Sequence, residues 1–179
     1  LTPTMLAALV KLDRDPEARS WTRDHLDFIC VGTAPLSSSI KEDFEQRFDV
    51  RLLESYGMTE ILIASGDSPE TPERPGSVGA LLPGTEIQSR DTDGSVLAAG
   101  QEGDLWVRSP YALEGYLDGD CDGGALSSPL QDGWLSTGDI GFEDQSGYLY
   151  ITGRRKDLII HGGANVSPPA VEESILRHE

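Results

Sequence analysis

The chain has 179 residues, of which 37% are hydrophobic and 25% charged, a composition typical of a globular protein that buries one good core or two small ones. Its 14 basic and 31 acidic residues give a net charge of -17, which repels phosphate backbones and argues against a nucleic acid partner. No apolar run approaches the roughly 18 residues that cross a membrane, so we expect no membrane span. Cys30 and Cys121 are too few for a disulfide scaffold, and the three histidines match no metal-ligand spacing, so we expect a cytoplasmic protein without structural zinc.

The first part of the chain, residues 1–65, predicts a parallel α/β layer. Apolar side chains recur at helical spacing in two segments, and the serines at 37–39 can cap the second of these helices. Two short apolar runs are typical of buried strands. We therefore expect helices over residues 4–12 and 40–48, and strands over residues 27–31 and 50–53. The order strand, helix, strand favours parallel pairing.

The middle of the chain, from about Asp67 onward, predicts a small antiparallel sheet or barrel. Prolines and a glycine over residues 69–76 break any regular element there. Short runs then alternate with Asp-Gly and Ser-Gly turns, which favour hairpins. The expected strands lie within residues 84–90, 103–108 and 148–151, and residues 118–129 are expected to form an exposed loop.

The last part of the chain begins near Arg154. Residues 157–160 predict a short strand, and two prolines at 168–169 lead into a helix over residues 170–176. A helix of this length is marginal alone. We therefore expect it to be the first element of a further domain.

A Gly-Thr-Ala-Pro-Leu-Ser turn over residues 32–37 separates the first strand from its helix. Small side chains there allow a flat ligand to approach the backbone, at the strand end where open α/β sheets bind ligands. The alternative is an ordinary strand-to-helix turn.

Residues 54–60, Glu-Ser-Tyr-Gly-Met-Thr-Glu, follow the second strand and group the side chains that a nucleotide requires. An aromatic ring can stack on a base, a hydroxyl can contact a phosphate oxygen, and a carboxylate can hold Mg²⁺. The alternatives are a structural Tyr-Gly turn and a helix N-cap at the Thr-Glu pair.

Two later segments offer groups for a ribose and for phosphates. In Trp-Leu-Ser-Thr-Gly-Asp, residues 134–139, Asp139 follows a predicted strand and can hold two ribose hydroxyls, as in dinucleotide-binding folds. The alternative is ordinary turn chemistry. Residues 153–157, Gly-Arg-Arg-Lys-Asp, form the main basic cluster, for which the alternative is a solvated surface turn.

In this order, the four motifs and the Gly-Gly-Ala-Asn-Val-Ser-Pro stretch that follows them resemble the acyl-adenylate-forming superfamily. That superfamily contains acyl-CoA synthetases, nonribosomal-peptide adenylation domains and firefly luciferase, and the resemblance covers residues 2–179. It implies a mixed α/β fold: the end of a large N-terminal domain, with a parallel α/β layer and a small antiparallel β-barrel-like subdomain, and the start of a small α+β C-terminal domain. The implied boundaries are residues 1–75, 76–155 and 156–179.

The resemblance also implies roles for single residues. Adenine would lie between the first turn and the motif tyrosine, with cofactor contacts from Gly32, Thr33, Ala34, Pro35, Tyr56 and Gly57. Thr59 would contact the α-phosphate and Glu60 would hold Mg²⁺. Asp139 would take the ribose hydroxyls, and Arg154 would reach the ribose or a phosphate. Thr59, Glu60 and Arg154 are the expected catalytic residues, because the α-phosphate gathers charge while pyrophosphate leaves.

The C-terminal motif implies a hinge. Lys156 matches the point where members of the superfamily rotate their small domain between adenylation and thioester formation. Gly162 and Gly163 match the loop that then lines the tunnel of the thiol, and their alternative is a simple hairpin turn. Lysine at this position and the stretch over residues 158–168 look like the CoA-ligase branch.

The implied reaction uses ATP and Mg²⁺ to activate a small carboxylic acid as an acyl-adenylate and transfers the acyl group to CoA. The alternative acceptor is the phosphopantetheine thiol of an acyl or peptidyl carrier protein in polyketide or nonribosomal peptide biosynthesis. An alternative of another class is a non-catalytic folded remnant or interaction module. Apolar residues at 61–63 favour a fatty or aromatic acid, unless they belong to the core.

Two parts of the superfamily's machinery find no match in this sequence. The phosphate loop with its lysine is expected upstream, and the catalytic lysine is expected beyond Glu179. Losing one such electrostatic contact costs about 10²–10³ in rate. We therefore expect that the 179 residues alone do not adenylate acids.

Overall fold

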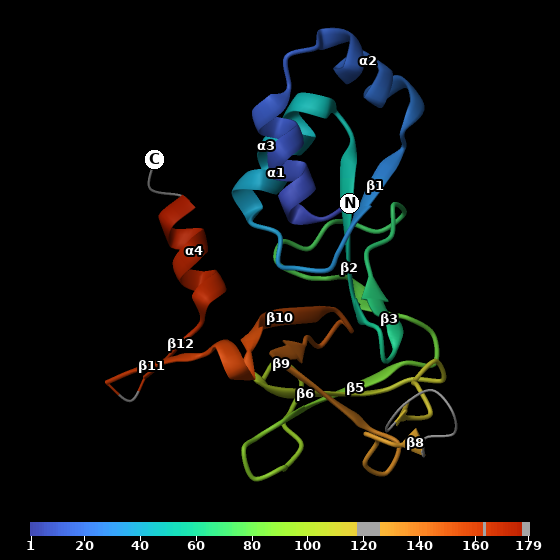
Figure 1. The fold of residues 1–179 in the computed structure, drawn as a ribbon, viewed down its shortest axis with the longest axis vertical. Helices are drawn as coiled ribbons and strands as arrows, with labels where there is room; N and C mark the ends of the chain where they lie inside the picture. Colours follow the sequence, from blue (N-terminus) through green and yellow to red (C-terminus); the bar gives the residue numbers. More distant parts are fainter. Residues whose placement is uncertain (118–125, 163, 177–179) are drawn as a thin grey trace.

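The computed structural model describes residues 1–117, 126–162 and 164–176 of the chain. Figure 1 shows α1–α3 with β1 and β2 at one end of the molecule and β5, β6, β9 and β10 at the other. The helices are α1 (Pro3–Leu12), α2 (Pro16–His25), α3 (Ser38–Phe48) and α4 (Pro168–Leu176), with a 3₁₀ turn η1 (Arg155–Asp157). The strands are β1 (Phe28–Val31), β2 (Arg51–Met58), β3 (Leu62–Gly66), β4 (Ala80–Leu81), β5 (Glu86–Arg90), β6 (Gly103–Arg108), β7 (Tyr116–Leu117), β8 (Leu126–Ser127), β9 (Leu135–Glu143), β10 (Leu149–Arg154), β11 (Ile159–His161) and β12 (Ala164–Val166).

The first three helices begin where side chains satisfy their free backbone N–H groups. Thr2 caps α1 and Ser37 caps α3, which confirms the two helices predicted from apolar spacing. Helix α2 was not predicted, although Asp15 caps it and Pro16 occupies its first turn. It buries no side chain, so it has no apolar stripe for a periodicity argument to detect.

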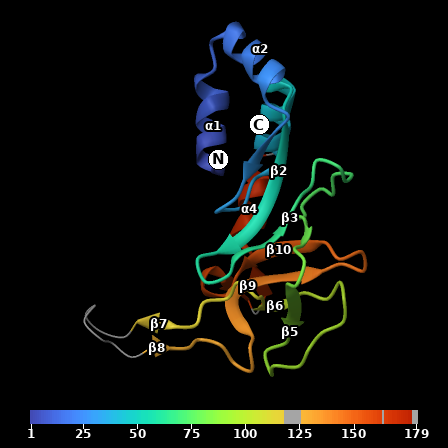
Figure 2. The ribbon, with the colours of Figure 1, turned by 90° about the vertical axis from the view of Figure 1, so that its right-hand side faces the viewer.

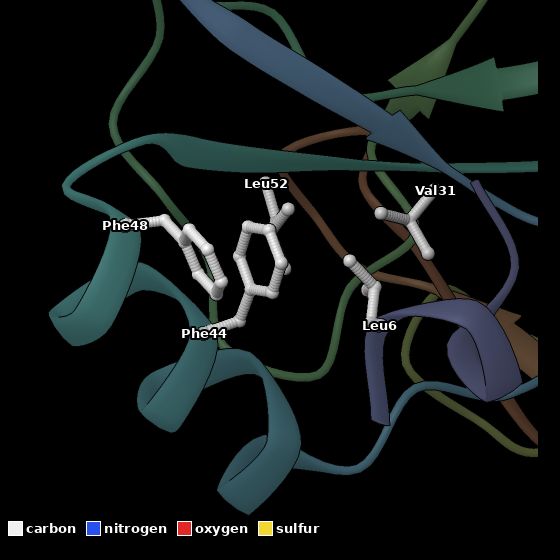
Figure 3. Packing of buried hydrophobic residues seen from close by; sticks show 5 residues of the cluster. All are labelled: Leu6, Val31, Phe44, Phe48 and Leu52. Atoms are coloured by element: carbon white, nitrogen blue, oxygen red, sulfur yellow. The ribbon is translucent and has the colours of Figure 1, made fainter. Parts of the chain in front are cut away.

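Strands β1 and β2 pair in parallel, with Phe28 opposite Arg51 and Val31 opposite Glu54, which confirms the predicted parallel layer. Helices α1 and α3 cover one face of this pair and enclose a core (Figure 3). Its buried members are Leu6, Val31, Phe44, Phe48 and Leu52. The prediction that β1 is a buried strand is wrong along most of its length, because Phe28 is 41% exposed and only Val31 is buried.

Strand β2 continues through the Tyr-Gly-Met motif and turns back as a hairpin with β3. The register shifts between Tyr56 and Gly57, and a Cβ at Gly57 would lie 1.9 Å from the carbonyl oxygen of Leu62. Only glycine fits this bulge. The motif was expected to form a turn after the strand, but half of it is strand, and the Thr59–Glu60 pair lies in the hairpin turn rather than at a helix N-cap.

The second sheet is antiparallel in the order β10-β9-β6-β5, as the Asp-Gly and Ser-Gly turns predicted. A second core cluster of Ile61, Ala64, Val107 and Leu135 joins the β2–β3 hairpin to this sheet. Backbone hydrogen bonds from Val78 to Leu149 and from Leu149 to Gly79 also link the two sheets. Figure 2 shows β2 running down toward β9 and β10, so the motif strand ends against the second sheet.

The C-terminal part leaves β10 through η1, the β11–β12 pair and α4. The predicted strand over residues 157–160 starts two residues late, and the predicted helix is confirmed. Helix α4 lies near α3, where the Ser38 hydroxyl donates a hydrogen bond to Glu173. The predicted loop over residues 118–129 falls largely outside the described residues.

The mixed α/β class predicted from the sequence is confirmed, while the boundaries at residues 75 and 155 stay predictions. Among the residues that the structure describes, no helix combines the length and the apolar character that crossing a membrane requires.

Candidate functional site

Three of the predicted site residues meet at the junction of the two sheets. The Tyr56 hydroxyl donates a hydrogen bond of 2.6 Å to Asp139 Oδ2. Arg154 Nε donates one of 2.7 Å to Asp139 Oδ1. Asp139 is 4% exposed, so its carboxylate is held between a phenol and a guanidinium with little contact with water. Residues from β2, β9 and β10 thus form one hydrogen-bonded cluster, the Asp139 cluster.

Strand pairing places the members of the Asp139 cluster. Arg154 lies directly opposite Asp139 in the β9–β10 ladder. The Thr137 hydroxyl accepts a 3.0 Å hydrogen bond from the Asp139 backbone N–H and donates a 2.9 Å bond to the Leu105 carbonyl on β6. Asp139 was expected after a strand, yet it lies inside β9, an interior strand. Its alternative as a turn residue is therefore wrong.

The electrostatics of the Asp139 cluster keep its two donors protonated. Burial raises the pKa of the Tyr56 phenol above its ordinary value, and the hydrogen bond to Asp139 raises it further. The same carboxylate raises the pKa of Arg154 through its hydrogen bond and charge. A carboxylate has about four acceptor positions, so Asp139 can accept further hydroxyls while these two bonds persist.

The predicted base-binding turn leaves β1 beside the strand that carries Tyr56. Because Val31 pairs with Glu54, residues 32–35 continue next to Ser55 and Tyr56. Thr33 has a φ of 77°, a left-handed conformation that costs a non-glycine residue on the order of 1 kcal/mol. The side chains of Thr33, Ala34 and Pro35 are exposed, while Gly32 is half-buried. An exposed, strained turn at a strand end is a suitable platform for a ligand.

Glu60 lies in the β2–β3 turn, apart from the Asp139 cluster. Its Oε1 accepts a 2.7 Å hydrogen bond from the Tyr116 hydroxyl on β7, and its carbonyl accepts a 2.8 Å bond from the Leu113 N–H. The hydrogen bond to Glu60 raises the pKa of Tyr116. The neighbouring Thr59 is exposed. Sequence reasoning missed Tyr116, because 56 residues separate it from Glu60 and no spacing rule joins them.

The donor set at Glu60 fits Mg²⁺ that arrives with a nucleotide. Within residues 1–117, 126–162 and 164–176, no group of three or more His, Cys, Asp or Glu side chains is arranged to hold a metal. Mg²⁺ is commonly bound by one or two carboxylates, with phosphates and waters completing its shell. One carboxylate in an accessible turn is therefore a sufficient protein contribution.

The predicted hinge residues lie outside the Asp139 cluster. Lys156 is exposed in η1, directly after Arg155, whose guanidinium forms an ion pair with Asp104 on β6. Gly162 lies in the turn between β11 and β12, with a φ of 57°. Gly163 lies outside the described residues.

A buried ion cluster that the sequence did not predict supports the motif strand. Lys41 on α3 is 8% exposed, and its Nζ lies 3.1 Å from Glu54 Oε1 and 2.7 Å from Glu73 Oε1. Burial lowers the Lys41 pKa, but the two carboxylates outweigh it and leave the pKa raised. Burial also raises the pKa of Glu54. The cluster joins α3 and the 67–75 connection to the start of the strand that carries Tyr56.

The apolar residues at 61–63 divide between the two interpretations offered for them. Ile61 is fully buried in the second core cluster, so it is a core residue. Leu62 and Ile63 are 64% and 49% exposed. Only these two are available to a ligand.

Comparison with known proteins gives consistent relatives. A model of the AMP-binding enzyme family matches residues 1–117. The chain is 40% identical to a 4-coumarate–CoA ligase-like protein of Oryza sativa over 98% of its own length, and 37% identical to a long-chain-fatty-acid–CoA ligase of Yersinia pestis over 86%. It spans 29% and 28% of those two relatives.

Solved structures agree with the sequence relatives. The ATP-bound MatB structure from Rhodopseudomonas palustris superposes on 97% of this chain with a TM-score of 0.82 at 31% identity, and 34% of MatB is covered. The o-succinylbenzoate CoA synthetase of Bacillus subtilis, in complex with its acyl-adenylate intermediate, covers 99% of the chain with a TM-score of 0.76 at 34% identity, and 35% of that enzyme is matched.

Proposed function

The chain belongs to the family of AMP-binding enzymes, and on that premise we propose that it is part of a longer AMP-forming acid:thiol ligase. In the first step, a carboxylate oxygen of the acid attacks the α-phosphorus of ATP. The bond from that phosphorus to the bridging oxygen breaks, and pyrophosphate leaves. In the second step, the sulfur of a CoA thiol attacks the acyl carbon, the thiol loses its proton, and AMP leaves.

The observation that carries this proposal is the Asp139 cluster. Tyr56, Asp139 and Arg154 come from three separate motifs, yet they share one pair of carboxylate oxygens. A structural tyrosine or a solvated arginine turn does not require such convergence. A nucleoside monophosphate does, because it presents a base, two vicinal hydroxyls and a phosphate within a short reach.

Each member of the cluster has a distinct role in the proposed reaction. The ring of Tyr56 and the turn over residues 32–35 would enclose the adenine, and Asp139 would accept the ribose hydroxyls. Arg154, whose side chain is 53% exposed, can move between the carboxylate and a ribose or phosphate oxygen. Its pKa is raised, so it stays a cation at every step.

The β2–β3 turn would serve the reacting phosphate. The exposed Thr59 hydroxyl can donate a hydrogen bond to an α-phosphate oxygen, and Glu60 would hold Mg²⁺. When bound, Mg²⁺ neutralises phosphate charge as pyrophosphate leaves. The chain's own contribution is to orient one hydroxyl and one carboxylate on a turn that the Gly57 bulge fixes.

The C-terminal segment would serve the second step. Lys156 follows the last residue that is paired to the sheet, so rotation of everything after it would leave the Asp139 cluster intact. Gly162 and Gly163 would line the passage of the thiol arm. The arm is common to CoA and to carrier proteins, so the acceptor has to be tested directly.

The test is pyrophosphate exchange by the full-length protein over a panel of carboxylic acids, followed by CoA and a carrier protein as acceptors. We expect acid-dependent exchange and AMP release with at least one fatty or aromatic acid, and thioester formation with CoA. Exchange without transfer to CoA, but with transfer to the carrier, would assign the alternative acceptor. Absence of exchange with every acid, while ATP binding also fails, would refute the proposal.

We further propose that a polypeptide of these 179 residues alone has no adenylation activity. It carries one candidate metal carboxylate and one candidate phosphate-facing arginine, but no lysine-bearing loop for the β- and γ-phosphates. Pyrophosphate exchange above background with this polypeptide would contradict the proposal.

A further inference from the structure

The turn that carries Glu60 is held by a segment far along the chain. The Leu113 N–H bonds the Glu60 carbonyl at 2.8 Å, and the Tyr116 hydroxyl bonds Glu60 Oε1 at 2.7 Å. Ala112 packs on the core cluster that contains Ile61, the residue after Glu60. Backbone, side chain and core contacts thus hold the segment over residues 109–117 against the turn.

The position of Tyr116 depends on the glycine before it. A Cβ at Gly115 would lie 2.9 Å from the Ser127 carbonyl oxygen, so only glycine lets β8 approach this closely. Tyr116 then pairs with Ser127 in the β7–β8 ladder. Its ring is 47% exposed, so burial does not explain why its hydroxyl is directed at Glu60.

We propose that Tyr116 is a positioning residue for the Glu60 carboxylate: its hydroxyl holds Oε1, so that Oε2 is presented to the Mg²⁺ of a bound Mg·ATP. This inference rests on the proposed function. Among the described residues, the Glu60 carboxylate makes this one side-chain hydrogen bond. A neutral donor suits the task, because it fixes the carboxylate without cancelling the charge that attracts the cation, whereas a lysine or arginine would compete with the metal.

The test measures ATP binding by the full-length protein as Mg²⁺ is titrated, using calorimetry, and again in EDTA. Tyr116→Phe removes only the hydroxyl. Tyr111→Phe is the matched control, since Tyr111 is 56% exposed on the same segment and its hydroxyl makes no hydrogen bond within the described residues. Glu60→Gln, alone and combined with Tyr116→Phe, completes a double-mutant cycle.

We expect Tyr116→Phe to raise the Mg²⁺ concentration for half-maximal ATP binding about tenfold, the effect of losing one hydrogen bond to a charged group. Binding in EDTA should be unchanged, as should both measurements for Tyr111→Phe. In the Glu60→Gln background the tyrosine change should have no further effect. Equal Mg²⁺ midpoints for wild type and Tyr116→Phe, or a lower midpoint for the variant, would overturn the inference and leave the proposed function standing. Failure of the wild type to bind ATP under either condition would instead refute the proposed function, and the inference with it.

Discussion

The two carboxylates of the candidate site are held in opposite ways. Asp139 lies inside an interior strand, is 4% exposed, and accepts hydrogen bonds from two side chains on two other strands. Glu60 lies in a hairpin turn and accepts one side-chain hydrogen bond, from a tyrosine that is itself half exposed. The same functional group is thus built into the fold at one place and attached to its surface at the other.

This difference follows from what each position can tolerate. A buried carboxylate is costly unless its oxygens are paired, so the fold must supply partners in every state of the protein. A carboxylate in a turn is already solvated, and a single neighbour can orient it at little cost. Asp139 should therefore matter for stability as well as for binding, whereas Glu60 should matter for binding alone.

The largest expected effect is that of Asp139→Ala on the stability of this chain. The change leaves the buried Tyr56 hydroxyl without its acceptor and Arg154 without its counter-charge, so we expect the free energy of unfolding to fall by about 3 kcal/mol. Urea denaturation followed by circular dichroism measures it. Glu60→Gln, at the contrasting position, should change the same quantity by less than about 0.5 kcal/mol. Similar losses for both variants would break the comparison.

The next effect separates the two tyrosines that bond these carboxylates. Tyr56→Phe should cost about 1–2 kcal/mol of unfolding free energy, because a buried acceptor loses its donor. Tyr116→Phe should cost less than about 0.5 kcal/mol, because water can replace its hydroxyl. Tyr148→Phe is the control for removing a phenol, since its ring contacts Arg74 through its face, which phenylalanine keeps. If Tyr56→Phe is as harmless as Tyr116→Phe, burial does not govern the Asp139 cluster.

The buried and exposed halves of the site were unequally predictable from the sequence. Helices α1 and α3 and the parallel β1–β2 pair follow from apolar period and capping, which are local signals. The convergence of Tyr56, Asp139 and Arg154 was expected only through the order of the motifs. Local patterning misplaced Asp139 after a strand, because a Gly-Asp pair inside a β-strand carries the same residues as a turn.

Contacts between distant polar side chains account for most of what was missed. The Tyr116–Glu60 bond and the Lys41 ion cluster join residues on different elements, and neither pair has a periodic or compositional signature. Helix α2 was missed for the opposite reason: its start signal is local, but without a buried face it lacked the second observation that would have selected it.

A third prediction extends the comparison to pH. The folded state raises the Lys41 pKa above its ordinary value of 10.5, since the pairing with Glu73 and Glu54 outweighs burial. Stability from this pairing is therefore fully present below about pH 10.5 and is lost as the pH rises through the raised pKa. We expect urea midpoints between pH 8 and pH 12 to fall more steeply for the wild type than for Lys41→Met. Lys11→Met, which removes an exposed lysine, should leave the steep fall unchanged. Equal slopes for the wild type and Lys41→Met would show that the buried pairing contributes nothing.

The smallest effect concerns the two adjacent arginines at the end of β10. Arg154 bonds Asp139, whose side chain is 5% exposed, while Arg155 bonds Asp104, whose side chain is 25% exposed. An exposed ion pair contributes less than about 1 kcal/mol, so the coupling energy of Arg155→Gln with Asp104→Asn should lie below that limit. It should also shrink further in 1 M salt, where charges are screened within about 3 Å.

The matched cycle of Arg154→Gln with Asp139→Asn should give the larger coupling energy and retain it in salt, because its carboxylate is shielded from ions by the strands around it. Both cycles remove a guanidinium from neighbouring positions of one chain, so differences in backbone or net charge cancel. If the Arg155 pair coupled more strongly than the Arg154 pair, the end of β10 would be fixed from the exposed side. The point of rotation proposed at Lys156 would then have to lie further along the chain, in the β11–β12 segment.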